Sequence, residues 1–424
     1  MTNSQLPQKT MSRASIAVAA FSTVVEWYDF TLYLYFATVL SRVFFGAGEA
    51  ALSITLATFA IAYLLRPLGG FVFGHIGDRF GRRRTMLLSV ALMTATMLGT
   101  ALLPTHAQAG AAAGWLLFLL RCVMGFSVGG EYIAVVAYLL EGAPRNRRGL
   151  ITTLASASSE IGGLLAVGIS LLTVNSMSVA SLDSWGWRIP FLVGAVLAGS
   201  VGIARTTMEE SPDFERQQAS GTAPANPLLY ALTNHRAGVL RGFAVSALGS
   251  ITYYVGITYV PTFLTSAGKL AESGALRLST IAAVAVILVT PFAGILSDWI
   301  GRKPVLIVLS LLSAILPITL FSLMAGGSPS YALLAAVVLA CVAGAVSAVG
   351  AIATAEQFPG EGRISGLALG ATTATAIFGG LTPYVAQVLT ARTGWIMVPG
   401  AMIAVVAVLA LPILATLPET APRK

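Results

Sequence analysis

Residues 74–84 read "GHIGDRFGRRR", and the pattern returns as "GILSDWIGRKP" at residues 294–304, a shift of 220 residues from Gly74 to Gly294. The glycine, aspartate and arginine positions correspond one to one: Gly74, Asp78, Gly81 and Arg82 match Gly294, Asp298, Gly301 and Arg302. A second stretch, "EGAPRNRR" at 141–148, matches "EQFPGEGR" at 356–363, a shift of 215 residues from Glu141 to Glu356. Two matches at nearly the same offset indicate that the chain contains two copies of one unit.

The composition places both copies in a membrane. Of the 424 residues, 56% are hydrophobic and only 10% are charged, which excludes a water-soluble fold of this length. A membrane span needs about 20 mostly apolar residues, and the chain offers roughly twelve such stretches, from 16–40 to 394–417. We therefore predict an all-α membrane protein with twelve transmembrane helices in two parallel six-helix repeats, residues 1–207 and 239–424, joined by a cytoplasmic linker at 208–238.

Positive charge follows the loops rather than a nucleic-acid-binding surface. The net charge is +8, but most of the 25 lysine and arginine residues fall in alternate loops. The positive-inside rule then predicts that both termini are cytoplasmic. The two cysteines, Cys122 and Cys341, lie in apolar spans and indicate packing. With three scattered histidines, no metal-ligand spacing and no phosphate loop, we expect no enzyme activity, no cofactor, no metal and no nucleic-acid partner.

Several local motifs carry a family resemblance. In chain order they are "EWYDF" (26–30), "RPLGG" (66–70), "GFSVGGEY" (125–132), "GWRIPF" (186–191) and "FGGLTP" (378–383). With the repeated loop, they resemble the metabolite:proton symporter family of the major facilitator superfamily, which includes carriers of citrate, 2-oxoglutarate, shikimate, proline and betaine. The resemblance implies the major facilitator fold and a monomeric, multi-pass carrier of the inner (plasma) membrane that uses the proton gradient.

On this resemblance we expect proton-coupled import of a small polar metabolite by alternating access. An organic acid, either a di- or tricarboxylate or a shikimate-like acid, is the first candidate, and a zwitterionic osmolyte such as proline or betaine is the second. A proton-driven efflux antiporter is a further alternative, although the fifth span, "LASASSEIGGLLAVG", lacks the Gly-Pro signature of that group. A receptor that binds without transporting remains the alternative from another class.

Ionisable residues within the spans are confined to the first repeat: Glu26, Asp29, Arg66, Arg121, Glu131 and Glu160. Asp29 lies about 20 Å along its helix from the inner surface, and Arg121 lies about 18 Å from the same surface, at 1.5 Å per residue. In the superfamily's sugar:proton symporters an acid of the first span pairs with an arginine of the fourth. The resemblance gives those roles to Asp29 and Arg121, with a permanent structural pair as the alternative.

The other embedded charges leave alternatives open. Glu26 lies one turn from Asp29 and is predicted as a second proton-coupling site, or as a packing and hydrogen-bonding residue. Glu160 lies near the membrane midplane and either contacts substrate or bonds a neighbouring helix. We assign Glu131 to inner packing and Arg66 to structure or coupling.

The repeated loops predict a cytoplasmic gate of charge pairs between the repeats: Asp78, Arg82, Glu141, Arg148, Asp298, Arg302, Glu356 and Arg363. Neutral polar groups of the second repeat and tyrosines of the first are candidate substrate contacts, with ordinary helix packing as the alternative. The full set of candidates is Tyr28, Tyr33, Arg121, Glu160, Tyr253, Tyr254, Tyr259, Tyr384 and Gln387. Gly379 and Gly380 are expected to permit a bend or a close approach.

Overall fold

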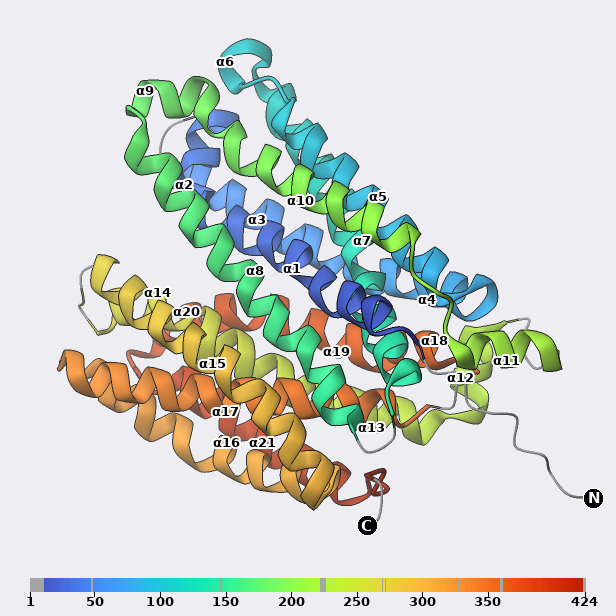
Figure 1. Ribbon diagram of the computed structural model, residues 1–424. Coiled ribbons are helices and arrows are strands. Elements are labelled where there is room, and N and C mark those ends of the chain that lie inside the picture. The colour runs from blue at the N-terminus through green and yellow to red at the C-terminus, as the bar shows by residue number, and fades with distance from the viewer. Residues whose placement is uncertain are drawn as a thin grey trace, which may run out of the picture.

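The computed structural model describes residues 11–46, 49–144, 147–221, 226–268, 270, 272–326, 328–358 and 361–421. These residues form helices joined by short turns, and no strand occurs among them (Figure 1). Within this part of the chain, nine helical runs are long and apolar enough to cross a membrane. They are Ala57–Phe80, formed by α3 (Glu49–Leu64) and α4 (Arg66–Phe80), with α5 (Arg82–Ala101), α7 (Ala111–Gly142), α8 (Arg148–Ser176), α10 (Arg188–Thr206), α15 (Glu272–Ile300), α16 (Arg302–Ala325), α17 (Pro329–Ala355) and α21 (Val398–Ala415).

The other three expected spans are helical but interrupted. The first is α1 (Arg13–Tyr35), α2 (Ala37–Leu40) and the π-helical η1 (Ser41–Phe45), and the seventh is α13 (Arg236–Tyr253), η4 (Tyr254–Thr258) and α14 (Val260–Ser266). The eleventh is a run of α18 (Arg363–Leu367), η5 (Ala368–Thr372), α19 (Thr373–Thr375), η6 (Ala376–Gly380) and α20 (Thr382–Thr393). A π turn inserts an extra residue and so rotates the side chains beyond it. With these three, the described residues are consistent with the twelve membrane-spanning segments of the expected fold.

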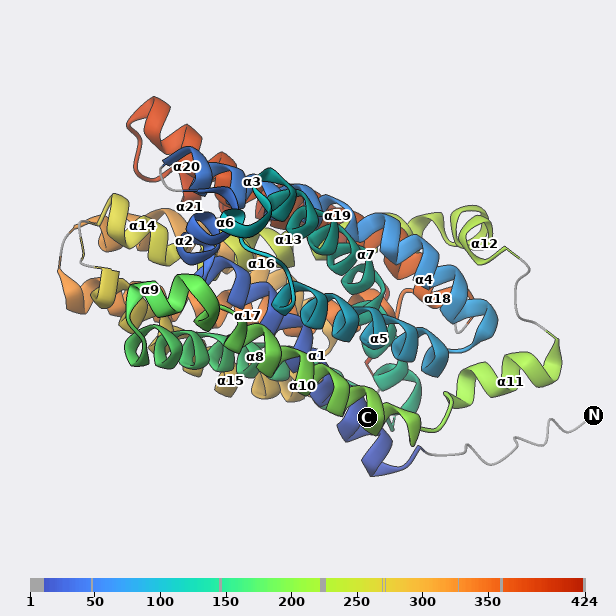
Figure 2. The ribbon, with the colours of Figure 1, turned by 90° about the horizontal axis from the view of Figure 1, so that it is seen from above.

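The two repeats form two layers. In Figure 1 the blue-to-green helices of the first repeat lie above the yellow-to-red helices of the second. The layers meet where α8 packs against α15 and where α4 packs against α18, which lie side by side in both views (Figures 1 and 2). Each repeat also has its own apolar core, around Trp187 and Phe191 in the first and around Phe263 and Phe321 in the second.

Glycines of the family motifs bring α4 and α7 into backbone contact. A Cβ added at Gly69 would lie 1.7 Å from the Phe126 carbonyl oxygen, and one at Gly129 would lie 2.0 Å from the Arg66 carbonyl oxygen. Small residues are what allow helices to approach closely in a membrane. The motifs "RPLGG" and "GFSVGGEY" therefore fix the position of Arg66, the first residue of α4.

The repeated loops turn at glycines on one face of the molecule. Gly81 and Gly301 adopt φ angles of 109° and 117°, a region that L side chains rarely enter. We call the face that carries Asp78–Arg82 and Asp298–Arg302 the motif face. Between the repeats run two short helices, α11 (Pro212–Ser220) and α12 (Pro227–Asn234), and three shorter elements connect the long helices: α6 (His106–Ala109), α9 (Val179–Ser181) and η3 (Leu182–Gly186).

Candidate functional site

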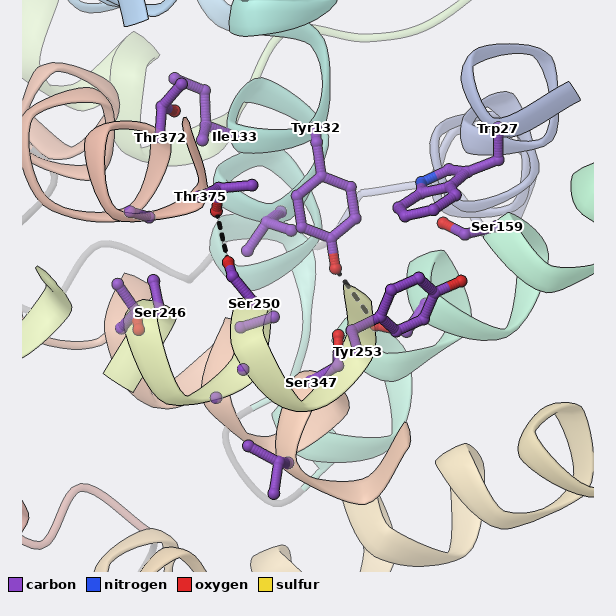
Figure 3. Close-up of a pocket in the computed structure, with 18 of the residues that line it drawn as sticks. Trp27, Tyr132, Ile133, Ser159, Ser246, Ser250, Tyr253, Ser347, Thr372 and Thr375 are labelled. Atoms are coloured by element: carbon purple, nitrogen blue, oxygen red, sulfur yellow. Dashed lines mark hydrogen bonds between the residues drawn. The ribbon is translucent and has the colours of Figure 1, made fainter. Parts of the chain in front are cut away.

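A cavity of about 150 Å³ lies between the two repeats. An engineered protein cavity of about this volume binds benzene, so the space suits a small metabolite. Its walls come from α1, α4, α7 and α8 on one side and from α13, α15, α17 and the η5–α19 segment on the other. Figure 3 shows the polar side chains of this wall, including Ser250 and Thr375, which share a hydrogen bond of 2.9 Å between their hydroxyl oxygens.

Three ionisable side chains of the first repeat line this central cavity. Glu26 of α1 and Arg66 of α4 approach to 3.5 Å between Oε1 and Nη2. Glu160 of α8 accepts a hydrogen bond from the hydroxyl of Tyr253, which belongs to the second repeat. The guanidinium of Arg66 also lies over the ring of Tyr63, 4.3 Å from its centre, which adds a cation–π attraction.

A pair of tyrosines joins the repeats beside the cavity. The hydroxyl groups of Tyr63 and Tyr254 are hydrogen-bonded, and the ring of Phe30 packs edge-on against both. Gly379 and Gly380 leave room for this pair, because an added Cβ would lie 2.9 Å from the ring of Tyr254 or 2.6 Å from that of Tyr63. In the structure the two glycines thus permit a close approach.

Asp29 and Arg121 form a buried two-bond ion pair. Arg121 Nη1 donates to Asp29 Oδ1 at 3.0 Å, and Nη2 bonds Oδ2. The pair lines a separate cavity of about 20 Å³, room for about one water, rather than the central one. Glu26 and Arg66 line both spaces, so they stand between the Asp29–Arg121 pair and the central cavity.

A further buried ion pair in the first repeat lies outside both cavities. Glu131 bonds Arg205, and it also accepts from Ser89 Oγ at 2.6 Å. Arg205 donates in addition to the Met86 carbonyl oxygen at 2.6 Å. Arg205 lies in the last turn of α10, yet its side chain is fully buried. This pair ties α7, α10 and α5 together.

On the motif face, each repeat uses an aspartate to hold the start of a helix in the other repeat. Asp78 accepts hydrogen bonds from the backbone N–H groups of Ile364 (3.2 Å) and Ser365 (2.8 Å) at the start of α18. Asp298 accepts in the same way from Gly149 (2.9 Å) and Leu150 (3.1 Å) at the start of α8. The partial positive charge of a helix start favours both contacts.

Arginines close the same face. Arg82 pairs with Glu141 (3.1 Å) and Asp78 (3.3 Å), and Arg363 of the second repeat reaches Glu141 at 2.7 Å. In the other repeat Arg302 pairs with Asp298 at 2.7 Å and with Glu356 at 3.3 Å. Arg148, the eighth predicted gate residue, is the first residue of α8 and directly precedes the N–H groups that Asp298 holds.

Two glutamates that sequence reasoning missed complete this network. Glu210 accepts from the backbone N–H groups of Arg82 (2.9 Å) and Arg83 (3.2 Å), and Glu419 accepts from those of Arg302 (2.9 Å) and Lys303 (3.2 Å). Burial raises the pKa of the Glu210 carboxyl, although its bonds to backbone N–H groups act against the rise. A signal was present, because "MEESP" after the sixth span resembles "LPETAP" after the twelfth.

Asp213 adds a contact that has no described counterpart in the second repeat. This residue of α11 bonds Arg363 at 3.2 Å, so the segment between the repeats is tied to the second repeat.

The candidate substrate contacts divide into two groups. Glu160, Tyr253 and Tyr254 line the central cavity. Tyr28 donates to the Pro190 carbonyl oxygen at 2.8 Å within the first repeat, away from the cavity.

Two further tyrosines also lie away from the central cavity. Tyr33 donates to the Thr55 carbonyl oxygen at 3.0 Å, and Tyr259 packs against Phe263 in the core of the second repeat. The side chains of Tyr384 and Gln387 lie outside the described residues. Sequence reasoning did not select Trp27 or Tyr132, which line the cavity, or Arg66 as a cavity residue.

Comparison with known proteins agrees with this architecture. Residues 15–225 match the family model "Sugar (and other) transporter", and residues 269–424 match the model "Major Facilitator Superfamily". The alpha-ketoglutarate permease of Escherichia coli is 34% identical over 88% of this chain and 86% of its own length. The ectoine/proline transporter ProP of Corynebacterium glutamicum is 32% identical over 91% of this chain and 80% of its own.

A solved structure shares the fold. The proton:xylose symporter XylE of E. coli, bound to 6-bromo-6-deoxy-D-glucose, superposes with a TM-score of 0.78 over 96% of both chains, at 21% identity. The relatives and this fold neighbour are transporters and not enzymes. On the two relatives above 30% identity along most of both chains, this protein is a multi-pass membrane transporter that belongs to the major facilitator superfamily.

Proposed function

We propose that the protein imports a small polar metabolite that carries a carboxylate, together with protons, by alternating access. The observation that carries the proposal is the position of the Asp29–Arg121 pair, which is separated from the central cavity by Glu26 and Arg66. The names of relatives support the class of cargo: alpha-ketoglutarate permease and ectoine/proline transporter, and also the citrate-proton symporter of Klebsiella pneumoniae. Organic acids and zwitterionic osmolytes are both candidates.

Proton and substrate transport would be coupled because the acids Asp29 and Glu26 pair with Arg121 and Arg66, and a proton or a substrate carboxylate can break these pairs. Arginine stays charged, so a proton can neutralise only the acid of each pair. Protonation of Asp29 weakens its bonds to Arg121, and protonation of Glu26 releases Arg66 toward the central cavity. A substrate carboxylate then takes the place of Glu26 on Arg66. Since each event favours the other, proton and substrate affinity are linked.

The motif face is the gate that alternates with an opening on the other side. The bonds made by Asp78, Asp298 and Arg363 cross between the repeats in the structure, which supports a carrier closed on that face. In this proposal residues 1–207 and 239–424 rock as two bodies around the cavity, and residues 208–238 connect them. The distribution of lysine and arginine supports a cytoplasmic motif face and cytoplasmic termini in the inner membrane, with one chain as the working unit.

The test is transport by the purified protein in liposomes. Uptake of radiolabelled 2-oxoglutarate, citrate, shikimate, proline and ectoine is measured with the external medium acidic, and then with the pH gradient collapsed by an ionophore. We expect accumulation of at least one compound that depends on the gradient. Asp29→Asn should lose accumulation while exchange down a gradient persists, because it removes the titratable group and keeps the shape.

The alternatives give different results in the same liposomes. An efflux antiporter would extrude its substrate when the gradient is imposed, and so reverse the direction. A receptor would bind substrate saturably without exchange of trapped label in counterflow. Normal uphill accumulation by Asp29→Asn would refute the coupling role of that residue.

A further inference from the structure

The buried acidic side chains differ in whether an arginine neutralises them. Six acidic residues are buried in the described part of the chain, besides Asp298 and Glu356, whose side chains are 4% exposed and pair with Arg302. Five of them have an arginine within 3.5 Å, in the pairs Glu26–Arg66, Asp29–Arg121, Asp78–Arg82, Glu131–Arg205 and Glu141–Arg82. The sixth, Glu160, has no cationic partner in the described part of the chain. Ions embedded in a membrane protein are normally paired. The negative charge of Glu160 would therefore be balanced by a group that is not part of the protein.

Glu160 faces the central cavity and not the helix packing around it. It is 7% exposed, it lines the cavity, and its bond to the Tyr253 hydroxyl crosses from one repeat to the other. A tyrosine hydroxyl can donate one hydrogen bond to a carboxylate but cannot supply a positive charge. The Glu160 carboxylate therefore has a hydrogen-bond donor, but this donor does not neutralise its negative charge.

Aromatic residues lie on the same part of the cavity wall as this carboxylate. The rings of Trp27 and Tyr253 meet edge-on with centres 5.1 Å apart. Tyr132 shares a hydrogen bond of 3.1 Å with Ser156, which lies one helical turn before Glu160 on α8. Figure 3 shows Trp27, Tyr132 and Tyr253 gathered on one side of the cavity next to Ser159. Aromatic faces beside a carboxylate are the surroundings that attract an organic cation.

The charges of the whole cavity favour the same class of ligand. Its described ionisable wall contains two acids, Glu26 and Glu160, and one base, Arg66. A substrate with two carboxylates would meet one guanidinium, already paired with Glu26, and the unpaired Glu160 would repel it. A substrate with one carboxylate and one cationic nitrogen would satisfy both Arg66 and Glu160.

We propose that Glu160, with Trp27 and Tyr253, forms the subsite for a positively charged nitrogen, and that the transported metabolite is a zwitterion whose carboxylate binds Arg66. The inference rests on the proposed function, because it takes the central cavity as the transport site. A proton carried by Glu160 is the competing way to balance the same charge. The two explanations differ in whether substrate binding depends on the charge of the ligand's nitrogen.

Pairs of ligands with the same shape and different charge test the subsite directly. Glycine betaine and 3,3-dimethylbutanoate differ only in a quaternary nitrogen against a carbon, and L-proline is compared with cyclopentanecarboxylate in the same way. Binding is measured by titration calorimetry on the purified full-length protein in lipid nanodiscs at pH 7. We expect the nitrogen compound of at least one pair to bind at least tenfold more tightly, a difference of about 1.4 kcal/mol.

Substitutions then assign the preference to Glu160. Glu160→Gln should reduce the preference to less than about threefold, whereas Glu160→Asp, which keeps the charge on a shorter side chain, should retain it. Tyr253→Phe removes the hydroxyl but keeps the ring and the unpaired carboxylate, so the preference should persist. The comparison of ligands on the unmodified protein does not depend on the folding of any variant.

Several results would overturn the subsite. They are equal binding within both ligand pairs, no binding of either zwitterion, or tighter binding of 2-oxoglutarate that strengthens in Glu160→Gln. A Glu160→Gln variant that keeps the preference and loses gradient-driven accumulation would identify a proton site instead. Failure of the proposed function looks different: no compound accumulates under a pH gradient, whatever the binding preference.

Discussion

The two repeats are alike on the motif face and differ in the membrane interior. On the motif face each repeat carries an aspartate that accepts hydrogen bonds from the start of a helix in the other repeat, and an arginine that pairs with a glutamate of its own repeat. In the interior, the buried acids lie only in the first repeat among described residues, and the second repeat supplies hydroxyl groups such as Ser250 and Thr375. The two repeats have thus kept the same charged contacts on the motif face, while the buried acids of the interior belong to the first repeat in the described part of the chain.

The largest expected effect comes from removing a charge from the interior of the first repeat. Arg121→Ala leaves Asp29 buried without its cation, and breaking a buried pair costs about 3 to 5 kcal/mol. We expect proton-driven uptake to fall at least 100-fold, measured in liposomes with an imposed pH gradient. Arg121→Lys is the control, because it restores charge without the two-bond geometry and should recover part of the activity. Undiminished proton-driven uptake by Arg121→Ala would mean that proton coupling does not depend on the Asp29–Arg121 pair.

The charged interior also depends on close contact between α1 and α8. A Cβ at Gly162 would lie 2.3 Å from the Val24 carbonyl oxygen, whereas one at the adjacent Gly163 would lie no closer than 3.6 Å to Thr31 Oγ1. We expect Gly162→Ala to destabilise the protein by about 1 to 3 kcal/mol and to lower its melting temperature in nanodiscs. Gly163→Ala is the matched control and should be neutral or slightly stabilising, because alanine is the better helix former. Equal melting temperatures would contradict the packing argument.

Substitutions at the gate test whether the symmetric motif face is also symmetric in function. Asp78→Asn and Asp298→Asn each weaken two hydrogen bonds to a helix start in the other repeat. We expect each variant to lower the transport rate about tenfold, or about 1.4 kcal/mol, with substrate affinity changed less than about threefold. Uptake kinetics and equilibrium binding separate the two quantities. A large effect in one variant and none in the other would show that the repeated loops have diverged in role.

The smallest expected effect concerns the hydroxyl groups of the second repeat. Tyr254→Phe removes the bond to Tyr63 beside the cavity and should shift substrate affinity about 5-fold, or about 1 kcal/mol, with the pH dependence of uptake retained. Tyr259→Phe is the control for a buried tyrosine away from the cavity. Uptake against substrate concentration at two external pH values decides the outcome. Loss of pH dependence in Tyr254→Phe would place part of the coupling in the second repeat.

The sequence predicts the position of a residue well where that residue lies in a regular, uninterrupted helix. The depth argument brings Asp29 to the level of Arg121 because each helical residue adds a fixed rise, and the two residues lie together in the structure. The repeated loops likewise place Asp78, Arg82, Asp298 and Arg302 on one face. For Arg205 the same reasoning fails, because a residue at the end of a span can turn inward to a buried acid instead of facing water.

Side-chain direction is harder to predict where helices are interrupted. Tyr254 faces the cavity and Tyr259 packs in the core, and the π segment Tyr254–Thr258 between them departs from the 3.6-residue period on which a sequence prediction of facing depends. On α1, a helix buried on several sides, apolar periodicity does not distinguish the cavity face from the packing face. The sequence therefore could not separate Trp27, which lines the cavity, from Tyr28, which bonds Pro190.

The bonds on the motif face and the bonds beside the cavity differ in strength, which bears on the state that we expect for the empty carrier. The motif face is held by several hydrogen bonds between charged groups, including Arg363 to Glu141 and to Asp213. Beside the cavity the repeats are joined by one neutral bond, Tyr63–Tyr254, and by one bond in which only the acceptor is charged, Tyr253 to Glu160. Hydrogen bonds to charged groups contribute more than neutral ones. We therefore expect the empty carrier to wait with the motif face shut. A protein that waits in this way leaks few protons without cargo, because only the free energy of binding shifts the population toward release.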